Sequence, residues 1–338
     1  MIALGIEGTA HTCGVGIVEM DENDNKKFKI LADVRKVFNP ECGGINPSES
    51  SNFIAENCPI AIKESLEISK LKKNEIDLVS FSKGPGLGPC LRMAATAART
   101  FSLYNKIPLI GVNHCVAHIE IGKTLGNLSN PLIVYVSGGN TQILMLKNKR
   151  YCIFGETVDI GIGNLFDKFG RNFKLSHPCG PKIEELAKKG KNFIDLPYTV
   201  KGTSSAFSGL LTSAIKKGKE ILEGKYKDLS FEDLCFSLQE VAFSMLVEIS
   251  ERALAHLKAE EVLLTGGVGN NKRLQEMLRL MAEEHNAKFY VPVNYCSDNG
   301  VMIALTSLKM YLAGIREKFE DTKVKQRFRT DKVEILWN

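Results

Sequence analysis

The sequence lacks the features that mark several common classes of protein. No apolar run approaches the ~20 residues that a membrane span requires, and the N-terminal stretch MIALGIEGTA has no basic segment followed by a long apolar one. The nine cysteines lie far apart and form no C-x-x-C pair, which disfavours a disulfide framework and a zinc-ribbon site. We therefore expect a soluble cytoplasmic protein with reduced thiols, no membrane partner, and folded structure from its first residue.

Length and composition indicate a globular protein of two domains. The chain has 338 residues, 44% of them hydrophobic and 25% charged, which is too long for one ordinary hydrophobic core. The net charge of +5 and the pI of about 8.6 permit a polyanionic partner without requiring one. The basic segment at residues 323–329 contains an aromatic side chain and suits a phosphate backbone with a stacked base, but a solvated edge strand is the commoner explanation.

Apolar stretches of β period alternate with longer segments of helical period, which is typical of α/β architecture. The predicted strands cover residues 2–6, 14–19, 78–81, 109–112, 132–136, 142–146 and 262–265. The predicted helices cover residues 49–68, 89–104, 115–125, 183–188, 231–256, 272–284 and 300–313. Because the chain has no low-complexity tract or long charged linker, its domain boundaries have to come from its motifs.

Two glycine-containing hairpins indicate sites for an anion. The segments IALGIEGTAHTCGVGIVEM, from Ile2, and LIVYVSGGNTQILMLKN, from Leu132, each combine a strand, a turn of small and hydroxyl residues, and a second strand. Such turns direct backbone N–H groups toward a phosphate, and two facing hairpins would clamp a nucleotide. Ordinary tight turns explain either hairpin alone equally well.

Two further segments are rich in glycine. TGGVGNN, from Thr265, follows a predicted strand and leads into a helix, which places backbone amides where α/β proteins bind ligands. It has neither the G-x-G-x-x-G spacing nor the Lys-Ser/Thr of a P-loop, so it predicts a nucleotide site of another kind, with close helix packing as the alternative. The glycine and proline loop at residues 81–92 indicates a rigid site wall or a sharp crossover.

The clearest chemical signal is the pair His114 and His118 in the segment NHCVAHIE. Because four residues are slightly more than one helical turn, both imidazoles project from one face and can bind one ion, although packed or solvent-facing histidines are commoner at this spacing. Asp298, in CSDNG, and Tyr135, at the end of a predicted strand, are candidate third and fourth ligands. This set suits iron or zinc, with manganese or magnesium as alternatives. A zinc peptidase is disfavoured because Cys115 stands where that signature needs Glu.

Nine motifs, in order along nearly the whole chain, resemble those of one family. They are GIEGTAHT at Gly5, GGINP at Gly43, FSKGPGLGPCLR at Phe81, GVNHCVAHIEI at Gly111, YVSGGNTQ at Tyr135, FGETVDIGIGN at Phe154, TGGVGNN at Thr265, CSDNG at Cys296 and RTD at Arg329. On these motifs the chain is identified as a member of the tRNA threonylcarbamoyladenosine synthase family, in the archaeal and eukaryotic branch that supplies the catalytic subunit of the KEOPS complex. The form GIEGTAHT is similar to that branch, whereas bacterial and organellar members usually carry a Ser-Cys-Asp-Glu variant.

The resemblance implies the actin-like ATPase superfold, with two duplicated lobes around a nucleotide and metal cleft. Residues 1–131 would form the N-terminal lobe, and residues 132–299 would form the C-terminal lobe with a helical insertion. Residues 300–338 are a candidate completion of the first lobe.

The resemblance also implies a reaction and a set of partners. The enzyme would transfer threonylcarbamoyl from threonylcarbamoyl-AMP to the exocyclic amine of the adenosine 3′-adjacent to the anticodon, in tRNAs reading codons that begin with A. Its partners would be tRNA and the other KEOPS subunits, namely a small atypical kinase or ATPase, a dimerising subunit and an accessory subunit. A small-molecule kinase of the actin superfold and a non-enzymatic ATP-binding module are the alternatives, although neither needs a two-histidine metal site.

Carried over by motif, the resemblance implies two groups of site residues. The metal, with iron expected first and zinc, manganese or magnesium as alternatives, would be held by His114, His118, Tyr135 and Asp298. The adenine nucleotide, threonylcarbamoyl-AMP or ATP, would be bound by Tyr135, Val136, Ser137, Gly138, Gly139, Asp167, Gly180, Glu184 and Asn271. Glu7 is the candidate acceptor of a proton from the attacking amine, and a carboxylate that only orients its loop is an equal alternative.

Several positions depart from the family pattern. They are Cys179 in place of the first Gly of P-G-G-P, Gly269 and Asn270 in place of an Ala pair, Lys83 for a common Gln, Ser204 for a frequent Asp, and Phe53 with Ile54 for two histidines. These departures affect the expected substrate contacts more than the expected fold.

Overall fold

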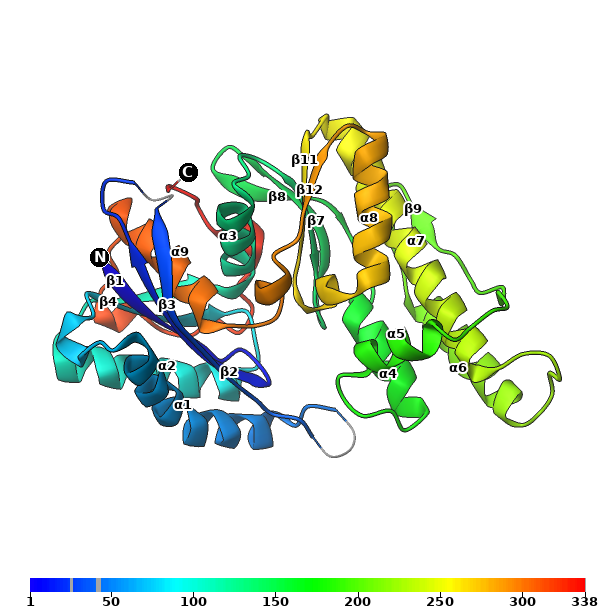
Figure 1. Cartoon of the computed structure of the whole chain (residues 1–338), viewed down its shortest axis with the longest axis horizontal. Helices are drawn as coiled ribbons and strands as arrows, with labels where there is room; N and C mark the ends of the chain where they lie inside the picture. The colour runs from blue at the N-terminus through cyan, green and yellow to red at the C-terminus, as the bar shows by residue number, and fades with distance from the viewer. Residues whose placement is uncertain (25–26, 41–43, 338) are drawn as a thin grey trace.

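The computed structural model describes residues 1–24, 27–40 and 44–337, and it has two lobes that are each built on a five-stranded sheet (Figure 1). Cys42 and the first residue of the GGINP motif, Gly43, lie outside the described residues. The first sheet has the order β3 (Phe28–Val37), β2 (Thr12–Met20), β1 (Ile2–Glu7), β4 (Leu78–Gly84) and β5 (Leu109–Asn113). The second has the order β12 (Lys288–Tyr290), β11 (Glu261–Thr265), β6 (Leu132–Val136), β7 (Thr141–Lys147) and β8 (Arg150–Glu156).

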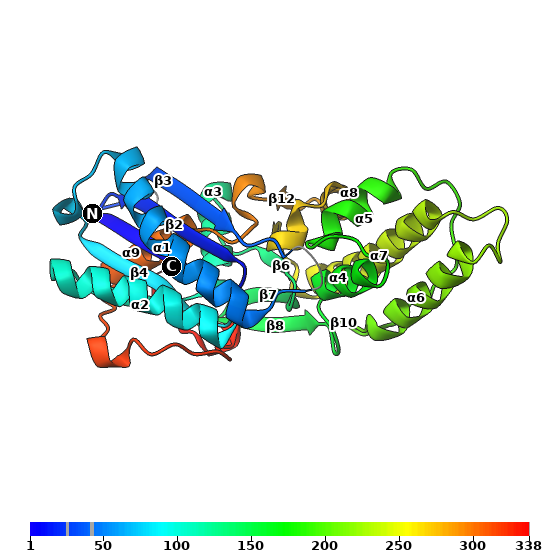
Figure 2. The same cartoon turned by 90° about the horizontal axis from the view of Figure 1, so that it is seen from below.

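The first sheet is covered by helices on both faces. Its strands β1, β2 and β3 are antiparallel neighbours, whereas β4 runs parallel to β1 and β5 runs parallel to β4. Helices α1 (Pro47–Ser69) and α2 (Gly88–Asn105) pack on one face, and α9 (Gly300–Leu312) and α3 (His114–Gly126) lie on the other (Figures 1 and 2). The strands β1, β2, β4 and β5 are therefore buried on both sides, which suits their nearly continuous apolar sequences, whereas the edge strand β3 is only partly buried.

Two glycines allow the helix α9 to lie directly on the strands β1 and β2. A Cβ atom at Gly5 would lie 2.3 Å from the backbone nitrogen of Ala304, and one at Gly16 would lie 2.3 Å from that of Val301. Helix α9 thus belongs, by its contacts, with the first sheet. We propose on this basis that residues 300–338 complete a lobe formed by residues 1–131, and that residues 132–299 form the other.

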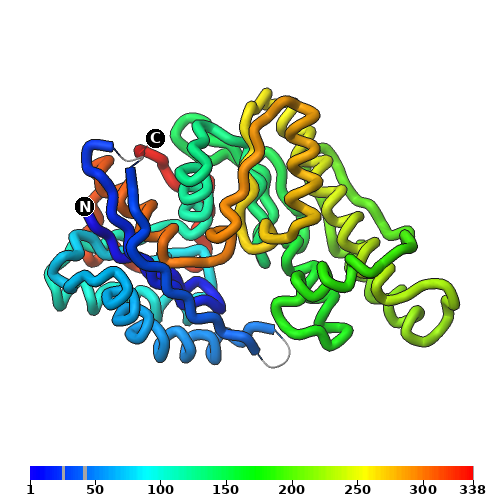
Figure 3. Tube along the Cα trace, in the orientation of Figure 1, coloured from blue at the N-terminus to red at the C-terminus, as the bar shows by residue number. Residues whose placement is uncertain are grey.

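The second lobe carries most of its helices on the side of the sheet away from the first lobe (Figures 1 and 3). These helices are α4 (Ile162–Asn172), α5 (Cys179–Ala187), α6 (Ser208–Leu222), α7 (Phe231–Leu257) and α8 (Lys272–Glu284). A short ribbon of β9 (Val200–Lys201) and β10 (Ser204–Ser205) lies between α5 and α6 in the chain. The opposite face of the second sheet packs against α3, so that α3 lies between the two sheets (Figure 1).

The seven predicted strands and seven predicted helices are present, and the two predicted hairpins are the antiparallel pairs β1–β2 and β6–β7. Among the described residues, the strands and α-helices that the sequence did not predict are β3, β8, β9, β10, β12, α4 and α6. Strand β3 lies at an edge and mixes charged with apolar side chains, and β12 has only three residues, so neither has a strong apolar pattern.

The basic segment at residues 323–329 forms no strand, so its explanation as an edge strand is wrong. It instead runs beside the end of β4, where the Lys325 N–H donates to the Lys83 carbonyl at 2.7 Å. Within residues 1–24, 27–40 and 44–337, no helix has both the length and the apolar character needed to cross a membrane.

Candidate metal and nucleotide site

Helix α3 begins where β5 ends, and its first two turns carry both predicted histidine ligands. The Asn113 side chain caps the helix by accepting the Val116 N–H at 3.0 Å, which fixes the point at which the helix starts. His114 and His118 then lie one turn apart, with ring centroids separated by 4.7 Å in an edge-on arrangement. Both imidazoles are buried, so neither is a solvent-facing histidine.

Asp298 joins the two histidines from the loop before α9. Its Oδ1 atom lies 3.5 Å from His114 Nε2 and 3.2 Å from His118 Nε2, and the three ligand atoms lie within 4.8 Å of one another. Asn299 caps α9 through the Met302 N–H at 2.8 Å, which holds this loop in place. Burial opposes ionisation of Asp298, but His114 and His118 outweigh it and hold the pKa of the carboxyl well below its usual range.

The second nitrogen of His114 is bound by Glu7, at the end of β1. Glu7 Oε2 lies 3.0 Å from His114 Nδ1, and Oε1 accepts the Thr9 N–H at 2.8 Å and the Thr9 hydroxyl at 2.6 Å. When His114 is neutral, a proton on Nδ1 that is shared with Glu7 leaves the lone pair on Nε2, the atom that faces Asp298. Burial alone would lower the pKa of His114, but the carboxylates of Glu7 and Asp298 raise it to about 9. Burial, followed by the positive charge of His114, lowers the pKa of His118.

The Tyr135 side chain lies near the cluster of His114, His118 and Asp298. Its ring centroid lies 5.7 Å from that of His118, and its buried hydroxyl has no hydrogen-bond partner among the described residues. Burial and the neighbouring Cys115 raise the pKa of this phenol well above its usual value. An unpartnered buried hydroxyl beside two imidazole nitrogens and a carboxylate fits a fourth ligand of a transition-metal ion.

Two glycine turns lie side by side at the carboxyl ends of β6 and β11, so this edge of the second sheet is formed by strand ends and not by an outer strand. The turn from Ser137 to Gly139 follows β6, the turn at Gly266 and Gly267 follows β11, and these parallel strands are paired so that Tyr135 is opposite Thr265. A Cβ atom at Gly139 or Gly267 would meet no heavy atom within 4 Å. The turns therefore present bare backbone to open space, as a phosphate-binding edge requires. Val136, the last residue of β6 before the first turn, is fully buried.

The other predicted nucleotide-binding residues form hydrogen bonds at the start of α5 and at the start of α8, next to this edge. Asp167, on α4, accepts the Cys179 N–H at 2.8 Å at the start of α5, beside Gly180. Glu184, on α5, accepts the Lys272 N–H at 2.9 Å at the start of α8. Asn271 caps α8 through the Leu274 N–H at 3.1 Å and donates to Gln239 at 3.0 Å.

Two histidines that the sequence did not assign to a role meet between the lobes. His11 follows β1, His177 precedes α5, and their ring centroids lie 5.8 Å apart, edge to face. The His177 side chain is only 7% exposed, and its Nδ1 atom lies 3.5 Å from Asp167 Oδ2 without forming a hydrogen bond. His11 lies within the motif GIEGTAHT, and His177 lies two residues before the departure at Cys179. Their positions in or near family motifs were the one sequence signal that could have marked them as site residues.

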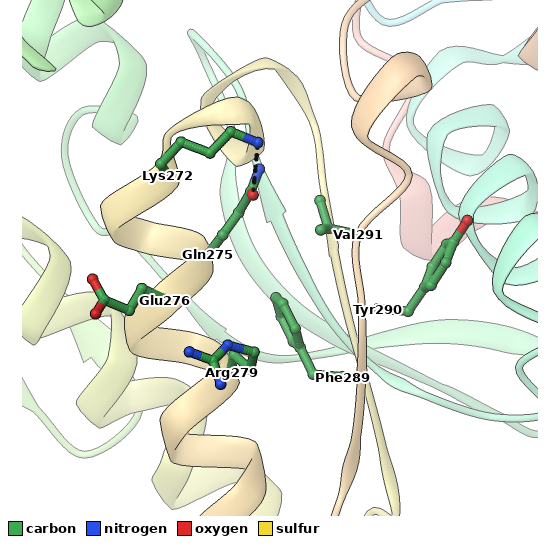
Figure 4. A pocket seen from close by; sticks show the side chains of 7 residues that line it. All are labelled: Lys272, Gln275, Glu276, Arg279, Phe289, Tyr290 and Val291. Carbon is green, nitrogen blue, oxygen red and sulfur yellow. Dashed lines mark hydrogen bonds between the residues drawn. The ribbon is translucent and has the colours of Figure 1, made fainter. Parts of the chain in front are cut away.

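A separate groove of about 430 Å³ lies between α8 and β12 (Figure 4). It is lined by Lys272, Gln275, Glu276, Arg279, Phe289, Tyr290 and Val291, and Lys272 donates to Gln275 at 3.2 Å. None of the predicted metal ligands lines this groove.

The two lobes, the glycine turns and the buried cluster between them define an α/β protein with the actin-like ATPase fold. Among solved structures, T. kodakarensis HypF is similar with a TM-score of 0.63 and 16% identity over 95% of this chain and 48% of that one. Component A of (R)-2-hydroxyglutaryl-CoA dehydratase from Acidaminococcus fermentans is similar with a TM-score of 0.52 and 14% identity, over 91% of this chain and 98% of that one. These likenesses concern the fold alone.

The family is shown by the sequence comparisons. Residues 29–305 match the tRNA N6-adenosine threonylcarbamoyltransferase family. The tRNA N6-adenosine threonylcarbamoyltransferase of Thermococcus sibiricus is 52% identical over 339 residues, covering all of both chains. A probable bifunctional tRNA threonylcarbamoyladenosine biosynthesis protein of Methanocaldococcus jannaschii is 52% identical over 341 residues, which are all of this chain and 60% of that protein. The chain belongs to the tRNA N6-adenosine threonylcarbamoyltransferase family and is a transferase, as its motifs predicted.

Proposed function

We propose that the chain transfers a threonylcarbamoyl group from threonylcarbamoyl-AMP to the exocyclic amine of the adenosine 3′-adjacent to the anticodon, in tRNAs reading codons that begin with A. The observation that carries this proposal is the convergence of His114, His118 and Asp298 within 4.8 Å, in a chain of this family. A small-molecule kinase or a non-enzymatic ATP-binding module would have no use for such a cluster.

The metal would be held by the Nε2 atoms of His114 and His118, the carboxylate of Asp298 and the phenol of Tyr135. Iron is our first choice and zinc, manganese or magnesium the alternatives, because two nitrogens with two oxygens suit all of them to different degrees. When bound, the ion supplies Lewis-acid polarisation of the donor. Glu7 would orient His114 and fix its tautomer, since both of its oxygens already accept hydrogen bonds.

The adenylate would lie along the edge formed by the two glycine turns. Backbone N–H groups of Ser137, Gly138 and Gly139 would bind its phosphate or carbamoyl end, and the surrounding residues would bind ribose and adenine. Those surrounding residues are Val136, Asp167, Gly180, Glu184 and Asn271. The bare backbone at Gly139 supports this arrangement, because a ligand can approach there without meeting a side chain.

The reaction needs alignment more than activation, because a carbamoyl-phosphate anhydride is already reactive. The adenosine amine forms a bond to the carbamoyl carbon, the bond from that carbon to the phosphate oxygen breaks, and AMP leaves with the electron pair. The amine loses one proton. Because the Glu7 carboxylate is buried and engaged by Thr9 and His114, we propose the orienting role for it over the role of proton acceptor.

The phosphate backbone of tRNA would dock on the helical insertion of the second lobe. Residues 168–230 contain thirteen Lys and Arg residues and six Asp and Glu residues, a net charge of +7, whereas the whole chain carries +5. Most of these basic side chains, including Lys189, Lys216 and Lys219, are exposed. Concentrated positive charge of this kind attracts a polyanion through release of its counterions.

We further propose that the chain acts in the cytoplasm as the catalytic subunit of the KEOPS complex, with a small atypical kinase or ATPase, a dimerising subunit and an accessory subunit. The Methanocaldococcus jannaschii relative supports a functional partner, since it is named bifunctional and this chain matches 60% of it.

Reconstitution tests the proposed function. The chain would be combined with threonine, bicarbonate, ATP, an adenylate-forming enzyme and unmodified tRNA, and nucleosides would be measured by mass spectrometry. Threonylcarbamoyladenosine should appear with the intact chain and not with the chain omitted. Its absence even after KEOPS partners are added would refute the proposal.

A further inference from the structure

A buried network of hydrogen bonds joins helix α3 to both lobes. Glu120, on α3, is fully buried and accepts the Tyr151 hydroxyl of β8 at 2.5 Å and the Lys309 ammonium of α9 at 3.1 Å. Tyr151 is also fully buried, and the Lys309 side chain is 11% exposed. Because β8 belongs to the second sheet and α9 packs on the first, a single side chain of α3 is bonded to both lobes.

The helix α3 has no solvent face that could set its orientation. Eleven of its 13 residues are buried. Ala117 and Ile121 pack with α9 and the first sheet, whereas Cys115, Val116 and Ile119 pack with the second sheet. Close packing determines which residues of α3 face each lobe. Hydrogen bonds are directional, and those of Glu120 add a constraint on the rotation of the helix at one defined point.

The rotation of α3 matters because the helix carries His114 and His118. A ligand atom at the outer radius of a helix lies about 5 to 6 Å from the axis, so a rotation of about 10° moves it by roughly 1 Å. Metal–ligand distances in proteins hold to about 0.2 Å. A small rotation of α3 therefore moves a ligand atom farther than the variation in distance that a metal site tolerates. Glu120 lies two residues beyond His118, which places it on the far side of the helix from that imidazole.

Further contacts hold the backbone of α3 without reaching across both lobes. The Thr265 hydroxyl of β11 donates to the His118 carbonyl at 3.1 Å, and Lys288 of β12 donates to the Gly126 carbonyl at 2.8 Å. Both donors belong to the second sheet. Among these contacts of α3, those of the Glu120 side chain are the ones that join the two lobes.

We propose that Glu120 is a positioning residue for the metal site. Through Tyr151 and Lys309 it fixes the rotation of α3 relative to both lobes, so the geometry of the ligands depends on how the lobes are arranged. This inference rests on the proposed metal-binding role of His114 and His118.

The test uses Co²⁺ as the probe, because the position and intensity of its visible absorption bands report ligand geometry. Tyr151→Phe removes one hydrogen bond and keeps the ring. The double substitution Glu120→Gln with Lys309→Met removes both charges of this ion pair, while the buried Lys123, which also interacts with Glu120, keeps its charge. Ile249→Val, in the buried core of α7, is the control for loss of stability without a link to α3.

Both network variants should show a changed Co²⁺ spectrum and a Co²⁺ affinity about tenfold lower, the lower end of the effect of outer partners of a metal site. The kcat for tRNA modification should fall while the KM for tRNA stays unchanged. Ile249→Val should lose stability only. Network variants that lose stability but keep the wild-type spectrum and affinity would overturn the inference, and Tyr151→Phe decides this even if the double variant does not fold.

Failure of the proposed metal site gives a different result. The intact chain would then bind no Co²⁺, or would bind it equally well after His114→Ala, before any network variant is measured.

Discussion

Glu7 and His114 are separated by 107 residues in the chain, yet Glu7 Oε2 lies 3.0 Å from His114 Nδ1. The bond joins the end of β1 to the first turn of α3. It leaves His114 Nε2 free to face Asp298 at 3.5 Å. A carboxylate in this position is the usual outer partner of a metal-binding histidine, so the bond connects the first hairpin of the chain to the candidate metal site.

Replacing Glu7 by Gln tests which of its two roles is correct. A Gln side chain has one acceptor oxygen and one NH₂ donor, so it cannot accept from both Thr9 and His114. We expect metal affinity to fall by about 10- to 100-fold, with activity falling in parallel and recovering in excess metal. Chelator competition and nucleoside mass spectrometry measure these quantities. Full metal content with lost activity would instead assign Glu7 to proton acceptance.

Removing both histidines of the candidate site should abolish metal binding. In the double variant His114→Ala with His118→Ala, two of the four proposed ligands are lost, and we expect neither bound metal by elemental analysis nor modified tRNA. His285→Ala is the matched control, since that histidine is bonded to Glu251 at 3.0 Å in another part of the molecule. A double variant that keeps full activity without metal would contradict the proposed site.

The sequence predicted the parts of this site that have a local signature. The spacing of His114 and His118 predicts a shared helical face. The apolar periodicity predicts the strand that carries Tyr135 and the helix that follows Asp298. Strands β3 and β12 were missed because an edge strand with mixed side chains and a strand of three residues give little periodicity.

Contacts between distant polar residues could not be predicted from one sequence. Glu120 has no pattern that marks it as bonded to Tyr151 and Lys309, and a helical Glu is normally expected at the surface. The meeting of His11 and His177 likewise depends on how the lobes are arranged. Such contacts follow from the tertiary structure, whereas the predicted motifs follow from the helical and strand repeats.

Two glycine substitutions should have different effects, one on ligand binding and the other on the stability of the fold. At Gly139 a Cβ atom would meet no heavy atom within 4 Å, so Gly139→Ala should leave the free energy of unfolding within about 0.5 kcal/mol of the original. It should weaken binding of AMP, because the methyl group occupies the proposed ligand space. At Gly16 the Cβ would lie 2.3 Å from the Val301 nitrogen, so Gly16→Ala should destabilise the fold by about 1 to 3 kcal/mol. Chemical denaturation and calorimetry measure the two effects, and unchanged AMP binding in Gly139→Ala would argue against the proposed edge.

Asp159 predicts a defined pH dependence of stability. Its carboxylate accepts the N–H groups of Phe207 and Ser208 at the start of α6, and although burial raises the pKa, these hydrogen bonds and that of the Ser208 hydroxyl lower it to about 2. A depressed carboxyl pKa gives stability that is present above the unfolded pKa near 4 and is lost as the pH falls through 2. Asp159→Ala should cost about 1 kcal/mol at pH 7, and this difference should shrink between pH 4 and pH 2. A difference that is constant over that range would show that the carboxylate charge contributes nothing.

The basic insertion predicts a dependence of tRNA binding on salt. Lys216 and Lys219 are exposed on α6 in the segment that carries a net charge of +7, so the double variant Lys216→Ala with Lys219→Ala should weaken tRNA binding and reduce its salt dependence. For each phosphate that a removed lysine had neutralised, the slope of log affinity against log salt concentration should fall by about 1. Lys29→Ala is the control, because Lys29 is also exposed but lies on β3 in the first lobe. Filter binding of unmodified tRNA over a series of salt concentrations measures both slopes. Equal slopes for the α6 variant and the β3 control would mean that tRNA is bound elsewhere, because a protein that neutralises fewer phosphates must release fewer counterions.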